Sequence, residues 1–258
     1  MFLEKIVEMK REEIRRRKSR SRQKEMEAAI PSLLPPRRFT KTVSGHSPIA
    51  VIAEIKRASP SLGMIHDRVD IAQLAGEYEK GGASAVSVLT EPHFFKGDLS
   101  HLHLVKKEVS LPVLQKDFIL DPFQIYESRV SGADAVLFIA AILDREQLHD
   151  FLDLSRSLYL DPLVEIHNEE DLEKISGLNL SLIGINNRDL RTFEVDLRTT
   201  LRLKKKIPST SGVISESGIK NSEDVRLLKA AGVNGVLVGE ILMRSSDPAS
   251  KIKELLGG

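Results

Sequence analysis

Four charged side chains close runs of apolar residues that are typical of buried strands. Lys116 closes the run 112–118 and Glu165 the run 162–166, while Glu54 and Lys56 lie two residues apart in the run 49–56 and so share one strand face. An ionised group removed from water costs several kcal/mol unless it is paired, so such positions commonly mark chemistry. A lysine beside carboxylates can donate protons or form a Schiff base. The pattern predicts an enzyme.

Further polar residues follow other predicted strands, so that the whole set comes from five strands. The added residues are Asp117, Asn186, Asn187, Arg188, Glu216 and Ser217. A buried ion-pair network that only fills the strand ends is the alternative for each residue. Convergence from five strands favours a catalytic site for the set. Asp117 is expected to face away from the site, because alternate residues of a strand point to opposite sides.

The elements that would position these residues alternate along the chain after residue 48. Apolar, β-branched runs predict strands at 49–56, 84–90, 112–118, 135–142, 161–166, 182–187, 212–218 and 235–240. Helical periodicity predicts helices at 70–81, 98–109, 121–131, 144–159, 168–177, 195–206, 221–231 and 247–256. Such alternation indicates right-handed βαβ units and a parallel sheet. Eight units in about 210 residues predict a closed (β/α)8 TIM barrel, whose active site lies at the carboxyl ends of the strands.

Residues at the helix ends agree with this count. The predicted N-caps are Asp121, Asp144 and Asp247, and the glycines that would end helices are Gly82, Gly132 and Gly232. An open, doubly wound sheet is the competing architecture. The barrel is favoured because no polar edge strand stands out.

Residues 1–47 precede the first strand and form a predicted helical extension. Apolar residues recur at helical spacing near the start, and Pro31, Pro35 and Pro36 break the chain afterwards. The extension is expected to pack on the barrel, so that residues 1–258 form a single domain, and it is long enough to cover one barrel mouth.

Charge is unevenly distributed, although the net charge is only +1. Residues 1–45 hold 13 Lys and Arg against six Glu, a net of +7, and the remaining residues carry −6. The basic cluster at 15–22 could be a nucleic-acid or membrane arm. Because no aromatic residue interleaves with it, a solvated helix face is favoured, and no nucleic-acid partner is predicted.

Composition places the protein in the cytoplasm by default. The chain has no cysteine, which fits a reducing compartment. Its longest apolar runs, such as 135–143, are too short to span a membrane, and charges near the start exclude a signal peptide. No membrane partner is expected.

Two glycine-containing turns end the last two predicted strands. Gly218 follows Glu216, and Gly239 precedes Glu240 and a short segment, 240–244, that could form an extra helix. Barrels often bind phosphate in these two loops. Tight-turn glycines without a ligand are the alternative, but the pair favours a phosphate.

Signals for a metal or a cofactor are poor. The seven histidines show no paired ligand spacing, and neither a Gly-x-Gly-x-x-Gly motif nor a P-loop is present. His167 follows Glu165 and could titrate near the site, although a loop histidine is the more common case. We predict neither a metal nor a cofactor.

Several longer motifs are distributed from the start of the chain to its last strand. They are Phe2-Leu-Glu-Lys-Ile-Val7, Ala53-Glu-Ile-Lys-Arg-Ala-Ser-Pro-Ser61, Leu89-Thr-Glu-Pro-His-Phe-Phe-Lys-Gly97, Gln115-Lys-Asp-Phe118, Leu163-Val-Glu-Ile166, Gly184-Ile-Asn-Asn-Arg-Asp-Leu190, Ser215-Glu-Ser-Gly-Ile219 and Leu237-Val-Gly-Glu240. Through these motifs the chain resembles, from end to end, the indole-3-glycerol-phosphate synthase family of tryptophan biosynthesis. The resemblance implies a lyase that acts on a phosphorylated open-chain ribulose carrying an anthranilate amine. The ring closes on the ketone carbon, CO₂ leaves, and loss of water gives the indole.

The resemblance also implies roles for individual residues. Lys116 would be the principal general acid, Glu165 an acid/base in the dehydration, and Lys56 a contact for anionic groups that can also donate a proton. Glu54 would orient the lysines. The residues expected to hold hydroxyls and water are Asn186, Glu216 and Ser217. A lysine can deliver its proton near neutral pH only if its pKa is lowered, and the balance between burial and nearby carboxylates stays open at this stage.

Substrate-binding residues follow from the same resemblance. Phe95 and Phe118 would form an apolar wall for the anthranilate ring. The residues expected at the phosphate are Ser59, Arg188, Gly218, Leu237, Gly239 and Glu240. Some relatives carry serine at position 240, so only the backbone N–H of Glu240 is expected to contact the anion.

Other functions remain open on the same scaffold. A sugar-phosphate isomerase, such as a phosphoribosylanthranilate isomerase, needs an acid/base pair but no decarboxylation, and the Glu54–Lys56 pair and the extension argue against it. A non-catalytic barrel that binds a phosphometabolite is the second alternative. The chain is expected to be a monomer or a weak homo-oligomer.

Overall fold

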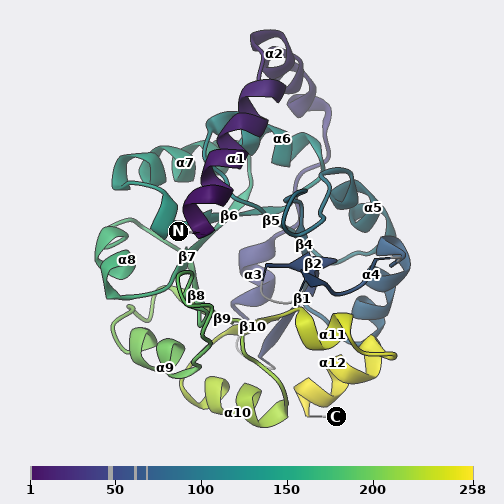
Figure 1. Cartoon of the computed structure of the whole chain (residues 1–258), viewed down its shortest axis with the longest axis vertical. Helices are drawn as coiled ribbons and strands as arrows, with labels where there is room; N and C mark the ends of the chain where they lie inside the picture. Colours follow the sequence, from purple (N-terminus) through teal and green to yellow (C-terminus); the bar gives the residue numbers. More distant parts are fainter. Residues whose placement is uncertain (1, 46–48, 61–62, 68, 258) are drawn as a thin grey trace.

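Eight parallel strands close into a barrel in the computed structural model, which describes residues 2–45, 49–60, 63–67 and 69–257 (Figure 1). The order around the barrel is β1-β10-β9-β8-β7-β6-β5-β4, and β1 pairs with both β4 and β10. Its strands are β1 (Ala50–Ile55), β4 (Ala85–Leu89), β5 (Val113–Lys116), β6 (Ala135–Ile139), β7 (Asp161–Ile166), β8 (Leu182–Asn186), β9 (Gly212–Glu216) and β10 (Gly235–Val238). The predicted (β/α)8 barrel is confirmed, and the open sheet is wrong.

Helices surround the barrel as the sequence predicts. They are α4 (Ile71–Lys80), α5 (Ser100–Glu108), α6 (Pro122–Val130), α7 (Arg145–Ser157), α8 (Glu169–Lys174), α9 (Arg198–Lys204), α10 (Ser222–Ala230), α11 (Glu240–Met243) and α12 (Pro248–Leu256). Asp121, Asp144 and Asp247 accept hydrogen bonds from backbone N–H groups as N-caps. The three predicted glycines have φ between 79° and 95°, which an L side chain rarely adopts.

Several strands end earlier than the sequence predicts. The run 135–142 is a strand only to Ile139, and the 3-10 turn η2 (Ala140–Ile142) follows it. The run 112–118 stops pairing at Lys116. Apolar residues continue past these strands because the barrel rim is also buried. Hydrophobicity alone therefore does not locate the last backbone hydrogen bond between neighbouring strands. A short hairpin, β2 (Ala58–Ser59) with β3 (Gly63–Met64), follows β1; Ser61 of the first motif lies outside the described residues.

The alternation of side chains divides the barrel into two buried layers. In β1, Ala50 and Ile52 belong to the cluster inside the barrel, whereas Val51, Ala53 and Ile55 pack against the surrounding helices. The inward series continues along the strand, so Glu54 also points inward at the carboxyl end. The same alternation directs the last inward-facing side chain of β5, β7 and β9 toward the barrel mouth at the carboxyl ends of the strands.

The amino-terminal extension contacts the barrel at both ends. Its helices are α1 (Phe2–Arg17), α2 (Arg20–Ala29) and α3 (Phe39–Val43), with the 3-10 turn η1 (Ile30–Ser32) between α2 and α3. Ile6 of α1 joins the inner apolar cluster from the strand carboxyl ends, and Phe39 and Val43 of α3 join it from the other end. Helix α1 begins at the barrel rim near β6 and β7 and runs outward in Figure 1, and α2 projects beyond the barrel.

Ion pairs tie the extension to the barrel. Lys10 of α1 is 1% exposed and lies 2.9 Å from the Asp117 carboxylate and 2.8 Å from Glu13. Burial by itself lowers the pKa of Lys10, but Asp117 and Glu13 outweigh burial and raise it. Asp117 thus balances a buried ammonium from α1, although it also lines the cavity at the strand ends, from which it was expected to face away.

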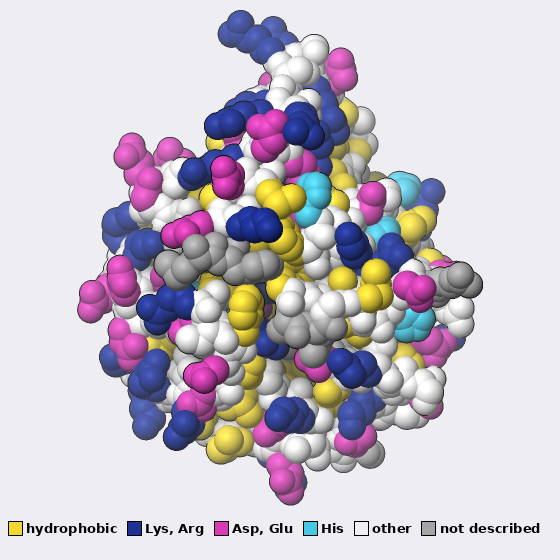
Figure 2. Space-filling view, in the orientation of Figure 1, with side chains coloured by type: hydrophobic (Ala, Val, Ile, Leu, Met, Phe, Trp, Pro, Cys, Tyr) yellow, Lys and Arg dark blue, Asp and Glu magenta, His cyan; other side chains and the backbone are white. Residues whose placement is uncertain are grey.

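The basic cluster at 15–22 is only partly the solvated face that the sequence favoured. Arg17 and Arg22 pair with the buried Glu127 of α6 at 3.0 and 3.1 Å, and Lys18 pairs with Asp121 at 2.7 Å. Lys and Arg side chains also gather on the projecting tip around α2, as Figure 2 shows. Among the described residues, no helix is both long and apolar enough to cross a membrane.

The buried Lys10–Asp117 pair generates a stability prediction. Lys10→Met should lower the free energy of unfolding by about 3–5 kcal/mol, because it leaves the Asp117 charge buried and unpaired. Urea unfolding followed by circular dichroism measures the change. The exposed Lys5→Met on the same helix is the control and should cost less than about 0.5 kcal/mol. Equal effects of the two substitutions would contradict the assignment.

Candidate active site

A cavity of about 720 Å³ opens at the carboxyl ends of the strands. All residues to which the resemblance assigns a role line it, whereas Asn187 does not. They are Glu54, Lys56, Ser59, Phe95, Lys116, Phe118, Glu165, Asn186, Arg188, Glu216, Ser217, Gly218, Leu237, Gly239 and Glu240. The barrel therefore brings together residues that are up to 186 positions apart in the chain.

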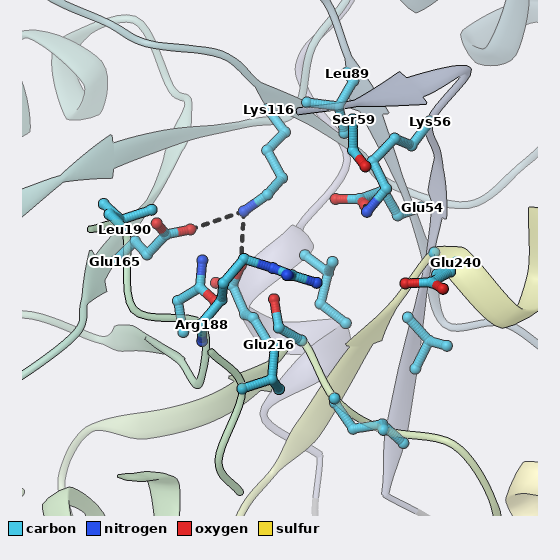
Figure 3. Close-up of a pocket in the computed structure, with 18 of the residues that line it drawn as sticks. Glu54, Lys56, Ser59, Leu89, Lys116, Glu165, Arg188, Leu190, Glu216 and Glu240 are labelled. Atoms are coloured by element: carbon cyan, nitrogen blue, oxygen red, sulfur yellow. Dashed lines mark hydrogen bonds and ion pairs between the residues drawn. The ribbon is translucent and has the colours of Figure 1, made fainter. Parts of the chain in front are cut away.

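Lys116 lies at the centre of a three-strand charge cluster. Its ammonium donates to Glu165 Oε2 at 2.8 Å and to Glu216 Oε2 at 2.6 Å, as the dashed lines in Figure 3 show. The side chain of Lys116 is 15% exposed, and those of Glu165 and Glu216 are 3% and 1% exposed. Three ionisable groups thus share a site that is nearly closed to water, where charge interactions are strong.

The electrostatic balance at Lys116, which the sequence left open, favours the charged form. Burial by itself lowers the pKa of Lys116. The carboxylates of Glu165 and Glu216, with a smaller contribution from Glu54, outweigh burial and raise that pKa above its usual value. The lowered lysine pKa that proton delivery would require is therefore not a property of the ligand-free site.

The two carboxylates on Lys116 differ in protonation. Burial raises the pKa of Glu216 to about 8, and Glu165 adds to this shift while Lys116 opposes it. Burial also raises the pKa of Glu165, but Lys116 and His167 outweigh it and bring that pKa well below its usual value. As the pH falls, a proton therefore binds to Glu216 before it binds to Glu165. The pKa values of two carboxyl groups on one cation differ in this way because ionisation of the first makes ionisation of the second less favourable.

Glu54 and Lys56 form a second ion pair on the other side of the cavity from Glu165 (Figure 3). Their charged atoms lie 2.8 Å apart, and Lys56 is 19% exposed. Gly239 on the neighbouring strand end leaves room for this carboxylate, because a Cβ there would lie 2.6 Å from Glu54 Oε1. Glycine is therefore required at position 239 by the acid beside it.

Gly184 is a residue whose role the sequence did not indicate. It lies inside β8, between β7 and β9, and a Cβ there would come within 2.3 Å of Glu216 Oε1. Glycine in a strand interior often marks a close approach. A glycine inside a predicted strand was therefore a signal for a close approach, but the sequence does not identify Glu216 as the group that approaches.

Left-handed backbone shapes the loop after β9. Ser217 and Gly218 have φ of 65° and 84° in succession. Asn187 holds this turn by donating to the carbonyl oxygens of Glu216 and Ser217 at 2.9 and 3.0 Å. Asn187, which the sequence placed at a strand end, is thus a buried support for the loop. Successive positive-φ residues turn backbone N–H groups toward a concave anion site.

Helix α11 begins after Gly239 on the facing loop, so the short extra helix is confirmed. The Glu240 carboxylate lies 3.7 Å from Arg244, one turn along this helix. Arg188 donates to the carbonyl oxygen of Phe193 at 3.1 Å, and its backbone N–H donates to Asn186 Oδ1 at 3.0 Å. Both Arg188 and Glu240 also line the cavity (Figure 3).

Aromatic residues form one wall of the cavity. The ring centroids of Phe95 and Phe118 are 6.2 Å apart, and the rings are tilted by 39°. Glu91, which is buried and was not predicted, accepts hydrogen bonds from the backbone N–H groups of His93, Phe94 and Phe95. It fixes the loop that carries Phe95.

The described residues contain one group of side chains spaced for a metal ion: Glu13, Glu91 and His93. Its carboxylates already have other partners. Glu13 pairs with Lys10 and Arg17, and Glu91 holds the backbone of its own loop. The group therefore serves the packing of α1 against the loop after β4.

The raised pKa of Glu216 generates a prediction about stability. Between the ordinary carboxyl value of 4.5 and about 8, the native state holds a proton that the unfolded state has released. The free energy of unfolding should therefore fall as the pH rises through this window, by at most about 1.4 kcal/mol per pH unit. Urea unfolding at several pH values should show a smaller slope for Glu216→Gln. An unchanged slope would show that Glu216 is ionised in the native state.

Comparison with known structures supports the barrel fold. A 3-hexulose-6-phosphate synthase superposes with a TM-score of 0.65 at 17% identity, over 81% of this chain and 99% of the other. A thiamine phosphate pyrophosphorylase from Pyrococcus furiosus superposes with a TM-score of 0.61 at 13% identity, over 84% and 96%. Identities this low establish a shared fold and nothing about activity.

Sequence comparison is more specific. The profile of the family described as indole-3-glycerol phosphate synthase matches residues 3–255. The indole-3-glycerol phosphate synthase of Desulforamulus reducens is 46% identical over 257 residues, which cover 99% of this chain and 97% of that protein. The one from Caldanaerobacter subterraneus is 46% identical over 260 residues and the full length of both. The chain therefore belongs to the indole-3-glycerol phosphate synthase family.

Proposed function

We propose that the cavity at the strand ends performs the reaction of this family, with Lys116, Glu165 and Glu216 as its central proton-transfer group. The aromatic ring carbon bearing the carboxylate bonds to the ketone carbon, CO₂ leaves, and a hydroxyl departs as water. The observation that carries the proposal is one ammonium shared by two carboxylates, inside the barrel mouth of a chain of this family. No step requires a cofactor.

Lys116 is proposed to protonate the carbonyl oxygen during ring closure. Its carboxylate partners keep the ammonium charged, so the proton is present at neutral pH. The same partners hold the proton too firmly for transfer. A substrate oxygen that replaces one carboxylate contact removes part of this stabilisation and brings the lysine pKa toward that of the acceptor. Glu165, which is ionised, then accepts a proton in the dehydration.

Lys56 is proposed to bind an anionic group of the substrate and to supply a second proton, with Glu54 as the group that orients it. Asn186, Glu216 and Ser217 would hold hydroxyls and water. Phe95 and Phe118 would bind the anthranilate ring, since their tilted rings offer an apolar wall of the right size.

The phosphate is proposed to lie between the two glycine loops. Backbone N–H groups near Gly218, Gly239 and Glu240 would donate to it. The Glu240 carboxylate is directed toward Arg244, which supports a backbone contact only. The remaining residues proposed for this end of the cavity are Ser59, Arg188 and Leu237.

An isomerase or a non-catalytic barrel is not favoured by any particular contact. We further propose that residues 1–258 act as one unit in the cytoplasm, as a monomer or weak homo-oligomer without a nucleic-acid partner. The pairing of Arg17, Lys18 and Arg22 with α6 supports the last point, since part of the basic arm is already neutralised.

Turnover of the carboxyphenylamino-deoxyribulose phosphate, followed by indole fluorescence without added metal, tests the proposal. Lys116→Ala should lower kcat by at least about 10²–10⁴-fold, the usual contribution of a general acid. Lys107→Ala, an exposed lysine on α5, is the control and should leave turnover unchanged. If wild-type protein binds the substrate but forms no product, the phosphate site is retained and the reaction is a different one.

Lys56→Ala separates binding from chemistry. It should raise KM and lower kcat together, because Lys56 is proposed to contact the substrate before and during the reaction. Steady-state kinetics beside Lys116→Ala provide the comparison. A Lys56→Ala enzyme with an unchanged KM would remove this lysine from substrate binding.

A further inference from the structure

His167 occupies a buried position behind the charge cluster, on the side of Glu165 that Lys116 does not reach. It follows β7 directly, and its side chain is 7% exposed. Its Nε2 lies 3.2 Å from Glu165 Oε1, and its Nδ1 lies 3.4 Å from Asp171 Oδ2. The imidazole therefore links a carboxylate of the site to a carboxylate at the start of α8.

Asp171 is itself fixed in place. Its backbone N–H donates to the N-cap residue Asn168 at 2.9 Å, and its Oδ2 accepts from the His167 backbone N–H at 2.9 Å. Only 4% of Asp171 is exposed. The first turn of α8 thus determines the position of the imidazole as well as the start of the helix.

We propose that His167 is a positioning residue for Glu165, which it holds in the orientation and the ionised state that proton transfer with Lys116 and the substrate requires. This inference rests on the proposed function. Glu165 has two oxygens, and Lys116 takes Oε2 while His167 takes Oε1. The contact with the imidazole at Oε1 would keep Glu165 oriented when the substrate displaces Lys116.

The charges around His167 agree with this role. Burial lowers the pKa of His167, but Asp171 and Glu165 outweigh it and raise that pKa to about 9. Among the described residues, the charged groups that act on the imidazole are these two carboxylates, and those that act on Glu165 are Lys116, His167 and Glu216. The imidazole is therefore an imidazolium at neutral pH and supports the negative charge of Glu165.

Removal of this cation should change the pH dependence of the reaction. Without it, the pKa of Glu165 rises, and Glu165 loses its proton-accepting form at a higher pH than in the wild type. An opposite charge at this distance shifts a carboxyl pKa by about one to three units. The acid limb of kcat/KM should therefore move up by about one pH unit or more, while KM at high pH stays the same.

Two substitutions at position 167 distinguish charge from contact. His167→Gln retains a side-chain N–H that can reach Glu165 but carries no charge, and His167→Asn is too short to reach it. Both should shift the acid limb, and only His167→Asn should also lower kcat at high pH, by about tenfold. The exposed His149→Gln on α7 is the control and should match the wild type. A ¹⁵N NMR titration of the imidazole should show a His167 pKa near 9, which Asp171→Asn lowers.

An acid limb of kcat/KM that does not move in His167→Asn overturns the proposal. An equal loss of activity at every pH, accompanied by a lower Tm, overturns it as well. Either result would assign His167 to packing alone. An imidazole pKa at or below 6.5 also overturns it. Wild-type protein without turnover would instead refute the proposed function, and the NMR titration would still decide whether His167 is charged against Glu165.

Discussion

The structure depends on a positive charge inside the barrel mouth. An ammonium in such a place is tolerated only if carboxylates reach it, and Lys116 has two, from strands on opposite sides of β8. Strand alternation makes this possible, because the inward series that ends in Glu165 and Glu216 begins with apolar residues that fill the barrel below. Gly184 completes the arrangement by leaving space on the strand between them.

The same constraint extends to the cover of the barrel. Lys10 reaches from α1 to Asp117, the residue after Lys116, so the helix that lines one side of the mouth is held by a charge at the edge of the site. At the other end, Phe39 and Val43 of α3 complete the inner core. Exclusion of water strengthens every ionic contact inside. The extension therefore contributes to the electrostatics of the site as well as to packing.

The sequence predicted the architecture well because period-2 strands and capped helices are local signals. It also identified the charged residues that end the strands and line the cavity, because a charge at the end of an apolar strand is conspicuous. It did not predict the links between them. The sequence does not distinguish Lys10 from the other charges of its predicted helix, and His167 was expected to be a loop histidine. Their roles come from distances to Asp117 and Glu165 across the fold, and no periodicity encodes those distances.

The division of protons within the cluster matches the proposed chemistry. Ring closure and loss of the hydroxyl each take up a proton, whereas formation of the indole double bond releases one. Lys116 holds the proton proposed for ring closure, Lys56 is proposed to supply the second, and the low pKa of Glu165 leaves its carboxylate free to accept one. Two protons are then given and one is recovered, so that each turnover draws one proton from the solvent. This balance requires unequal carboxylates, and the unequal surroundings of Glu165 and Glu216, with His167 beside only the former, provide them.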